Sequence, residues 1–215
     1  IIGSTGKVGK SLISILKDID VITADRKDGF DLTDTRQVYN ILEREADKVL
    51  YLAGLTSPQE CQRNHPLSLR LNYETPAALA DGLHEKLVFT STDLVFDGTK
   101  KDYTELEKPE KNSESVYAHH KRKAEEKVLS TGGTIIRLGL VINGPINYVR
   151  NNIGNKIFSW TNKTNKPTSV HDLAKLIEKI TSNNYDQKIF HCAIGEELNR
   201  YDLNVKIAEH YGLDS

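Results

Sequence analysis

The chain has 215 residues, 38% of them hydrophobic and 27% charged, which suits one ordinary domain with a buried core, or one domain with a small appendage. Its 29 Lys and Arg residues nearly balance its 30 Asp and Glu residues, so no excess of charge indicates a nucleic-acid or membrane partner. The longest apolar runs are too short to cross a bilayer. We therefore expect a soluble, cytoplasmic protein.

The two cysteines and the paired histidines do not predict a metal site. Cys61 and Cys192 are far apart in the sequence, and we expect two structural thiols rather than a disulfide framework. His119 and His120 are adjacent on a predicted helix and point about 100° apart, so they cannot easily share one ion. We expect no bound metal.

The start of the chain is unusual for this type of sequence. There is no Met, and Ile1-Ile2 stands directly before a glycine-rich turn. A strand of normal length needs several residues at that place. We therefore expect residues to be missing at both ends of the chain.

Short β-rich runs alternate with longer helical patterns, which predicts an α/β domain built on a parallel sheet. The predicted strands cover residues 1–2, 21–24, 48–52, 86–90, 134–137 and 188–192. The predicted helices between them cover residues 8–18, 35–45, 67–82 and 115–129. Because crossovers between parallel strands are right-handed, these elements predict a doubly wound, Rossmann-type sheet.

The pattern weakens after residue 144 through an Asn- and Lys-rich stretch, and two more helices are predicted at 171–181 and 201–210. We expect residues 1–144 to form a dinucleotide-binding domain. Residues 145–215 are expected to form a small substrate-binding lobe, interleaved with that domain, over the carboxyl edge of the sheet. Trp160 is expected to be a packing anchor, with stacking on a nucleotide base as the alternative.

A glycine-rich run joins the first predicted strand to the first predicted helix. Gly3 and Gly6 let the backbone turn sharply and approach a diphosphate, whose charge meets the helix N-terminus. Gly9 permits close packing of the helix on the strand. A tight turn without a ligand is the alternative. The predicted cofactor contacts in this run are Gly3, Thr5, Gly6, Lys7, Val8 and Gly9.

Carboxylates at the next strand end bear on the choice of cofactor. Asp25 follows the glycine turn by about 20 residues, where a carboxylate can hold a ribose hydroxyl. Arg26 beside it could instead neutralise a 2′-phosphate, so NAD and NADP both stay open. Asp31 and Leu32 could place a carboxylate and an apolar wall against adenine, and an N-cap role for Asp31 or Asp34 is the alternative.

A candidate proton donor stands at the start of the helix predicted over 115–129. Tyr117 and Lys121 are four residues apart, which stacks a phenol and an ammonium on one helix face. The cation is expected to lower the pKa of Tyr117, so that the phenol can give a proton to a carbonyl that receives hydride. Thr92 ends a strand at the same crevice and could hydrogen-bond a substrate oxygen, or only satisfy backbone groups there.

In this order the motifs resemble the extended short-chain dehydrogenase/reductase superfamily, and within it most resemble the dTDP-4-dehydrorhamnose reductases. The resemblance covers essentially the whole chain. The motifs that carry it are Gly3 to Gly9, Asp31-Leu32-Thr33-Asp34, Leu52-Ala53-Gly54, Asn72, Ser91 to Gly98, Tyr117 with Lys121, Glu125, and residues 166–174 and 190–192 of the predicted lobe.

The resemblance implies a reductase that moves hydride from NADPH or NADH to the keto group of a 4-keto-deoxysugar nucleotide. It implies that Tyr117 is the acid/base, that Thr92 orients the sugar ketone and that Lys121 binds the nicotinamide ribose. It also implies that Asn72 supports its helix and a proton-relay water, and that two copies pair as a homodimer through the helices at 67–82 and 115–129. Other implied cofactor contacts are Leu52, Ala53, Gly54 and Thr90.

Two departures from the family pattern keep other functions open. Ala118 and His120 stand where family members usually show Gly and Ser or Thr, and Arg137 is followed by Leu138-Gly139-Leu140, which is closer to sugar-nucleotide epimerases. One alternative is therefore an NAD-dependent sugar-nucleotide epimerase or dehydratase. Another is a non-catalytic relative similar to the regulatory subunit of methionine adenosyltransferase.

Overall fold

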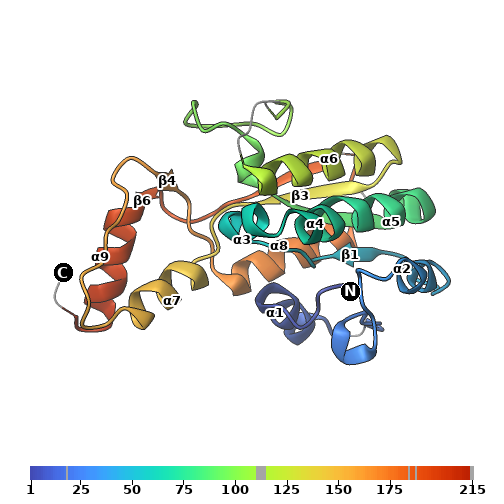
Figure 1. The fold of residues 1–215 in the computed structure, drawn as a ribbon, viewed down its shortest axis with the longest axis horizontal. Coiled ribbons are helices and arrows are strands. Elements are labelled where there is room, and N and C mark those ends of the chain that lie inside the picture. Colours follow the sequence, from blue (N-terminus) through green and yellow to red (C-terminus); the bar gives the residue numbers. More distant parts are fainter. Residues whose placement is uncertain (18, 110–114, 184, 187, 214–215) are drawn as a thin grey trace.

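The computed structural model describes residues 1–17, 19–109, 115–183, 185–186 and 188–213. Its centre is a parallel sheet with the strand order β1-β2-β3-β5 and helices on both faces (Figure 1). The strands are β1 (Val49–Tyr51), β2 (Leu87–Thr92), β3 (Thr134–Leu138) and β5 (Ile189–Cys192). The predicted Rossmann-type, doubly wound α/β fold is confirmed.

The first two predicted strands extend the sheet beyond β1 only as single bridges. Ile2 pairs in parallel with Tyr51 on one side and with Ala24 on the other. Its N–H donates to the Leu50 carbonyl, and its carbonyl accepts from the Leu52 N–H. The two predicted strands are therefore corrected to bridges.

Helices bury the sheet from both sides. One face is covered by α2 (Thr35–Leu42), α5 (Thr75–Leu83) and α6 (Val116–Ser130), and the other by α1 (Lys7–Ile15) and α8 (Val170–Ser182). Successive strand residues point to opposite faces, so Tyr51 and Phe89 pack on the first side while Leu50 and Val88 pack on the second. All of β2 is buried, as expected for a strand covered on both faces.

Side-chain caps fix where several helices begin. Asp34 accepts from the Arg36 N–H at the start of α2, which is the N-cap role considered for it. Ser115 caps α6 and Ser169 caps α8 in the same way. The caps explain why the starts of these helices lie close to the predicted ones. The ends of α1 and α2 lie earlier in the chain than the predicted residues 18 and 45.

The helix predicted over residues 67–82 contains a π-helical turn, Arg70–Glu74. Thr75 donates its N–H five residues back along the chain, and Pro76 has no N–H to offer. The Leu71 carbonyl is thereby released from the helix and accepts the Tyr51 hydroxyl at 2.7 Å. The prediction of one regular helix is therefore wrong at this turn, and such turns are frequent at functional sites.

The remaining elements are short or lie near the C-terminus. Turns of 3-10 helix occur at Arg26–Asp28, His84–Lys86 and Asp93–Val95. The other helices and strands are α3 (Pro58–Arg63), α4 (His65–Leu69), α7 (Asn143–Asn151), β4 (Thr164–Asn165), β6 (Leu198–Asn199) and α9 (Arg200–His210). Of these, α3 and α7 fall where no helix was predicted.

A small lobe lies beside the sheet, built from α7, α9 and the antiparallel pair β4 and β6 (Figure 1). Val149, Leu203 and Ile207 form its own small core. Two elements that lie between these in the sequence are not part of the lobe. β5 is a strand of the central sheet, and α8 covers one face of that sheet. Trp160 is 60% exposed, with the Lys163 ammonium 4.7 Å from its ring centroid, so its predicted role as a packing anchor is wrong.

Two further observations concern the chain as a whole. Cys61 and Cys192 are buried free thiols, as predicted. Within the described ranges, no helix combines the length and the apolar content that crossing a membrane requires.

Candidate functional site

The glycine turn brings three stretches of backbone into close contact. Gly3 has a φ of +89°, and a Cβ there would lie 2.6 Å from the Ala53 nitrogen. A Cβ on Gly9 would lie 2.6 Å from the Gly3 carbonyl oxygen. Gly6 is the exposed N-cap residue of α1, and no acidic side chain stands in the first turn of that helix. The Gly6 N–H donates to the Gly3 carbonyl, whereas the N–H groups in the first turn of α1 can be offered to an anion.

The side chains of the turn divide between solvent and the core. Thr5 and Lys7 are exposed, whereas Val8 packs against the core between α1 and α8. Asp25 is buried beside the turn, where the Ser4 hydroxyl donates to one of its carboxylate oxygens and the Thr5 hydroxyl, at 3.5 Å, to the other. Ser4 was not predicted as a site residue, although it lies inside the motif.

Asp31 and Leu32 make contacts within the chain itself. Asp31 is exposed and accepts from the N–H and hydroxyl of Thr33 at 2.9 and 2.8 Å, which lowers the pKa of its carboxyl group. Leu32 packs partly against the core under α2 and α5, and its carbonyl accepts from the Thr75 hydroxyl. The observed role of Asp31 is thus to close the turn before α2.

Lys121 is buried at the carboxyl end of β2. Its side chain donates to the Thr90 carbonyl at 2.7 Å, and its nitrogen lies 4.3 Å from the centroid of the Phe89 ring. With only 3% of the residue exposed, burial lowers the pKa of Lys121 from its ordinary 10.5 to about 7, and the negative charge of Glu125 acts in the opposite direction. At neutral pH this amine therefore exists in both protonation states.

The turn that follows β1 lies between the glycine turn and Lys121. Ala53 touches Gly3, as described above, and a Cβ on Gly54 would lie 3.9 Å from the Lys121 nitrogen. The same Cβ would lie 2.7 Å from the side-chain oxygen of Asn72, so only glycine fits there. Leu52, just before this turn, packs partly against the core.

Tyr117 lies one helical turn before Lys121 on α6, and its side chain contacts Thr92. Tyr117 is 6% exposed, and burial raises the pKa of its hydroxyl, while a hydrogen bond with Thr92 has the opposite effect. The expectation that Lys121 lowers this pKa is contradicted, because desolvation outweighs the other influences on the phenol. Tyr117 therefore keeps its proton at neutral pH. Thr92 also accepts from the Leu94 N–H at 3.2 Å, which is the backbone role considered for it.

The predicted residues thus follow one another along the carboxyl edge of the sheet. Asp25 contacts the glycine turn, the glycine turn contacts the turn after β1, and that turn lies beside the Lys121 nitrogen. Lys121 bonds the strand that ends at Thr92, and Thr92 contacts Tyr117. The Phe89 ring beside the ammonium was not predicted from the sequence. Its position next to Thr90 on the same strand is the signal that could have indicated it.

A buried ion pair supports the helix that carries Tyr117 and Lys121. Arg137 of β3 donates through its Nε and Nη2 to Glu125 of α6, with a shortest distance of 2.8 Å, and both side chains are 3% exposed or less. The Arg137 Nη1 also contacts His191 of β5 at 3.2 Å. Phe96 covers the guanidinium, 4.9 Å from its ring centroid. This cluster fixes α6 on the strands behind the site.

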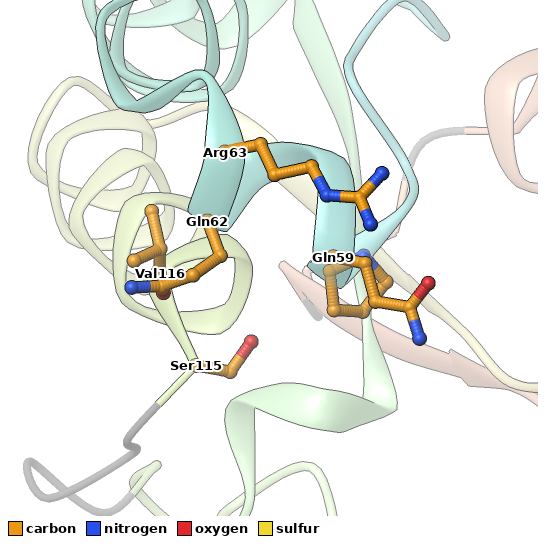
Figure 2. A pocket seen from close by; sticks show the side chains of 6 residues that line it. Gln59, Gln62, Arg63, Ser115 and Val116 are labelled. Carbon is orange, nitrogen blue, oxygen red and sulfur yellow. The ribbon is translucent and has the colours of Figure 1, made fainter.

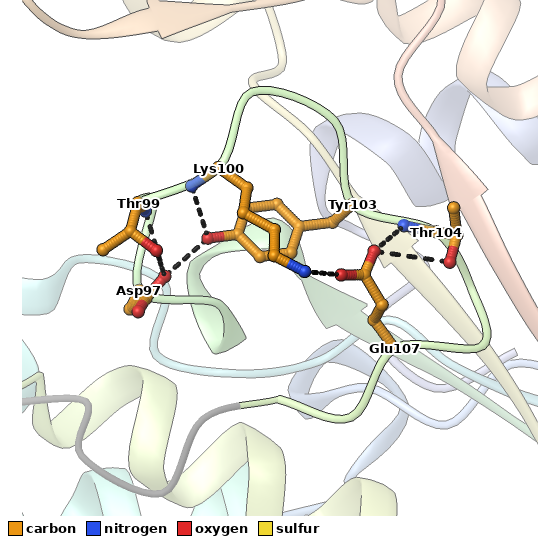
Figure 3. A network of polar contacts seen from close by, with 6 residues as sticks. All are labelled: Asp97, Thr99, Lys100, Tyr103, Thr104 and Glu107. Atoms are coloured by element: carbon orange, nitrogen blue, oxygen red, sulfur yellow. Dashed lines mark hydrogen bonds and ion pairs between the residues drawn. The ribbon is translucent and has the colours of Figure 1, made fainter.

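The loop that follows Thr92 is braced by its own side chains (Figure 3). Asp97 accepts from Tyr103 at 2.5 Å and from Thr99, which lowers the pKa of its carboxyl group. Glu107 accepts from Lys100 and from Thr104 in the same way. The members of this network are Asp97, Thr99, Lys100, Tyr103, Thr104 and Glu107. Since the Glu105 carboxylate accepts from the His191 N–H, the loop is also joined to β5.

A shallow hollow open to solvent lies between α3 and the start of α6 (Figure 2). Its lining residues are Pro58, Gln59, Gln62, Arg63, Ser115 and Val116. Among the residues that the structure describes, none of the predicted site residues lines it. The hollow is nevertheless next to the first turn of α6, because Val116 immediately precedes Tyr117.

Comparison with solved structures gives the same fold along the whole chain. A hypothetical dTDP-4-dehydrorhamnose reductase from Sulfolobus tokodaii is 26% identical, with a TM-score of 0.87 over 100% of this chain and 82% of that one. A dTDP-4-dehydrorhamnose reductase from Bacillus anthracis, crystallised in complex with NADP, is 21% identical, with a TM-score of 0.84 over 99% of this chain and 80% of that one.

Comparison with sequences gives a further relative and a family. Methionine adenosyltransferase 2 subunit beta from Bos taurus is 25% identical over 205 residues, which are 86% of this chain and 60% of that subunit. The chain thus spans less than two thirds of the length of this relative. The family model described as the RmlD substrate binding domain matches residues 1–215. The chain belongs to the RmlD substrate binding domain family.

Proposed function

We propose that this chain is an NAD(P)H-dependent reductase of a 4-keto-deoxysugar nucleotide, with Tyr117 as the proton donor. The observation that carries the proposal is that the predicted residues from Asp25 to Tyr117 lie next to one another along the carboxyl edge of the sheet. In open α/β sheets this edge is where ligands bind. Substrate, cofactor and turnover are all part of the proposal.

The residues at this edge fit a dinucleotide. The absence of side chains at Gly3 and Gly9 lets the backbone pack tightly before α1, whose first turn offers N–H groups to a diphosphate. Asp25 can hold an adenosine ribose hydroxyl, and the exposed Arg26 beside it can contact a 2′-phosphate, so the proposal includes NAD and NADP. The nicotinamide of such a cofactor, when bound, supplies the hydride.

The protein's own part is to orient the ketone and give it a proton. Tyr117 is protonated at neutral pH and so has a proton to give, although burial, which raises the pKa of its hydroxyl, makes it a weaker acid than a free phenol. Thr92, in contact with that hydroxyl, can donate a hydrogen bond to the same ketone oxygen. Lys121, with a pKa of about 7, can take up or release a proton beside them and hold a ribose hydroxyl.

Three of the comparisons support the proposal. The family match covers the whole chain, and a solved structure of the same fold was crystallised in complex with NADP. The Sulfolobus tokodaii protein, at 26% identity, is described as a hypothetical dTDP-4-dehydrorhamnose reductase. The substrate class proposed for this chain follows that resemblance.

Replacing Tyr117 with Phe tests the proposal. Removal of the proton donor should lower the turnover of a keto-deoxysugar nucleotide by about 100-fold or more, while the Kd for NADPH or NADH stays nearly the same. Tyr73→Phe is a matched control, since this half-buried phenol lies on the neighbouring π-helical turn, and it should keep full turnover. Unchanged turnover in Tyr117→Phe would refute the proposed role.

A second candidate function follows from the relationship to methionine adenosyltransferase 2 subunit beta. In that case the chain would use the nucleotide site to present a surface to a partner enzyme. This candidate predicts cofactor binding without oxidation of the cofactor by any keto sugar, and co-purification with a methionine adenosyltransferase. Oxidation of NADPH in step with sugar reduction would exclude it as the main activity.

A further inference from the structure

His120 is a buried titratable group for which the proposed reaction has no use. It lies on α6 between Tyr117 and Lys121 and is only 1% exposed. Its contacts are with α4: the Ser68 hydroxyl lies 2.9 Å from its Nδ1, and the His65 ring meets its ring edge-on at 4.9 Å. The cost of burying this ring is offset only if its polar atoms have partners.

From His120 a chain of hydrogen bonds runs to the turn that follows β1. Asn72 donates from its Nδ2 to the Ser68 hydroxyl oxygen at 3.3 Å. The same nitrogen donates to the Leu55 carbonyl at 3.0 Å, and the Asn72 Oδ1 accepts from the Leu55 N–H at 3.2 Å. Asn72 thus holds Leu55 by both of its backbone groups, as a neighbouring strand would. Ser68 and Asn72 are fully buried.

The donor and acceptor of each hydrogen bond in this series can be assigned by starting from the Leu55 backbone. Leu55 has one donor and one acceptor, which fixes the orientation of the Asn72 amide. The Ser68 oxygen then accepts from Asn72, so its own hydrogen points to the Nδ1 of His120. This arrangement needs a neutral imidazole with its proton on Nε2.

The electrostatic surroundings keep the imidazole neutral. The pKa of His120 is lowered to about 4, mainly by burial, and the nearby His65, His119 and Lys123 contribute in the same direction. A protonated ring would turn Nδ1 into a donor, and the Ser68 oxygen would then face donors from both sides. The chain of hydrogen bonds therefore stays intact at neutral pH.

We propose that His120 is a positioning residue, which acts through Ser68 and Asn72 to hold the turn at residues 53–55 in place. That turn touches the glycine turn at Gly3 and lies beside the Lys121 nitrogen. A displacement at Leu55 would open both contacts. The inference rests on the proposed function in one respect, that residues 53–55 line the nicotinamide end of a cofactor cleft.

The test uses four variants. Two of them break the series of hydrogen bonds from His120 to Leu55, one preserves it, and one is a control. His120→Leu removes the acceptor, and Ser68→Ala removes the link. His120→Asn keeps an acceptor near the place of Nδ1. His119→Leu changes the exposed neighbouring histidine and leaves the chain untouched. Residue-resolved amide hydrogen exchange of the full chain reports on the Leu55 N–H, and a fluorescence titration gives the Kd for NADPH.

The Leu55 N–H should exchange about tenfold faster in His120→Leu and Ser68→Ala, because its acceptor on Asn72 is no longer held. The Kd for NADPH should rise severalfold in the same variants. His120→Asn and His119→Leu should both stay close to the original protein. Long-range proton–nitrogen NMR should show His120 with its proton on Nε2 and an Nδ1 signal that moves in Ser68→Ala.

The possible outcomes decide between the positioning role proposed for His120 and a role in packing only. If His120→Leu does not fold, Ser68→Ala alone carries the test, since it deletes a single oxygen atom. Unchanged Leu55 exchange in Ser68→Ala overturns the proposal, and so does equal loss in His120→Leu and His120→Asn, which would assign His120 to packing only. Faster Leu55 exchange in a protein that reduces no sugar refutes the proposed function and leaves the positioning role standing.

Discussion

The buried charge of Lys121 at the candidate site is expected to lower the free energy of unfolding by a measurable amount. Burial moves its pKa from 10.5 to about 7, and each pKa unit corresponds to about 1.4 kcal/mol, so the charged form costs about 5 kcal/mol in the folded state. This cost is the net effect of the surroundings, in which the Thr90 carbonyl and the Phe89 ring favour the charged form. Replacing Lys121 with Met removes the charge and keeps most of the volume.

The sign of the pH dependence follows from the two states. Between pH 7 and 10.5 the unfolded chain binds a proton at Lys121 that the folded chain does not, so the free energy of unfolding rises with pH over this window. Below pH 7 both states are protonated and the full cost is present. Lys121→Met lacks this contribution at every pH. Its stability relative to the original protein should therefore be highest near pH 6 and fall by several kcal/mol, at most about 5, by pH 10.

Urea unfolding of both proteins at pH 6, 7, 8, 9 and 10 measures the difference directly, because all other titrating groups contribute equally and cancel. The variant should also lose turnover at every pH. Parallel stability curves, with a difference constant within about 1 kcal/mol, would show that the ammonium is solvated in the folded protein. The reasoning about Lys121 would then be refuted.

Two further substitutions test the frame of the site. Gly3→Ala should destabilise the fold by more than about 2 kcal/mol and abolish cofactor binding, because its Cβ would meet the Ala53 nitrogen; Gly29→Ala, also at positive φ but with open space around it, should cost only about 1 kcal/mol in urea unfolding. Glu125→Gln should cost about 3 to 5 kcal/mol by the same measurement, since it leaves the Arg137 charge buried without its counter-ion; a cost below about 1 kcal/mol would contradict the burial of that pair.

The sequence was most informative where caps and periodicity agree. α8 and α9 begin one residue before their predicted starts, because Ser169 and Asn199 cap amphipathic or polar-faced segments. α7 was missed because Gly144 and Pro145 stand in its first turn, and both weaken a helical pattern. Proline is tolerated at the start of a helix, where its missing N–H has no partner to lose. The helix is stabilised there by its packing against α9.

The site was predictable in its residue types and less so in its electrostatics. The spacing of Tyr117 and Lys121 is visible in the sequence, but the desolvation that dominates both pKa values depends on how deeply strand and helix bury them. In the sequence His120 stood out as a departure from the family pattern and as one of two adjacent histidines, and neither feature indicated its role. Its partner Ser68 is 52 residues earlier, and the fold alone brings the two together.

The central claim is that the carboxyl edge of the sheet aligns a nicotinamide with a ketone next to the Tyr117 hydroxyl. The most direct test is to incubate the protein with a 4-keto-deoxysugar nucleotide and NADPH or NADH that carries deuterium at the transferable C4 position, and to analyse the sugar by mass spectrometry. The account predicts a product with one deuterium at the former ketone carbon, and almost none from Tyr117→Phe. Binding of the labelled cofactor with no deuterium in the sugar, across a panel of keto sugars, would contradict it.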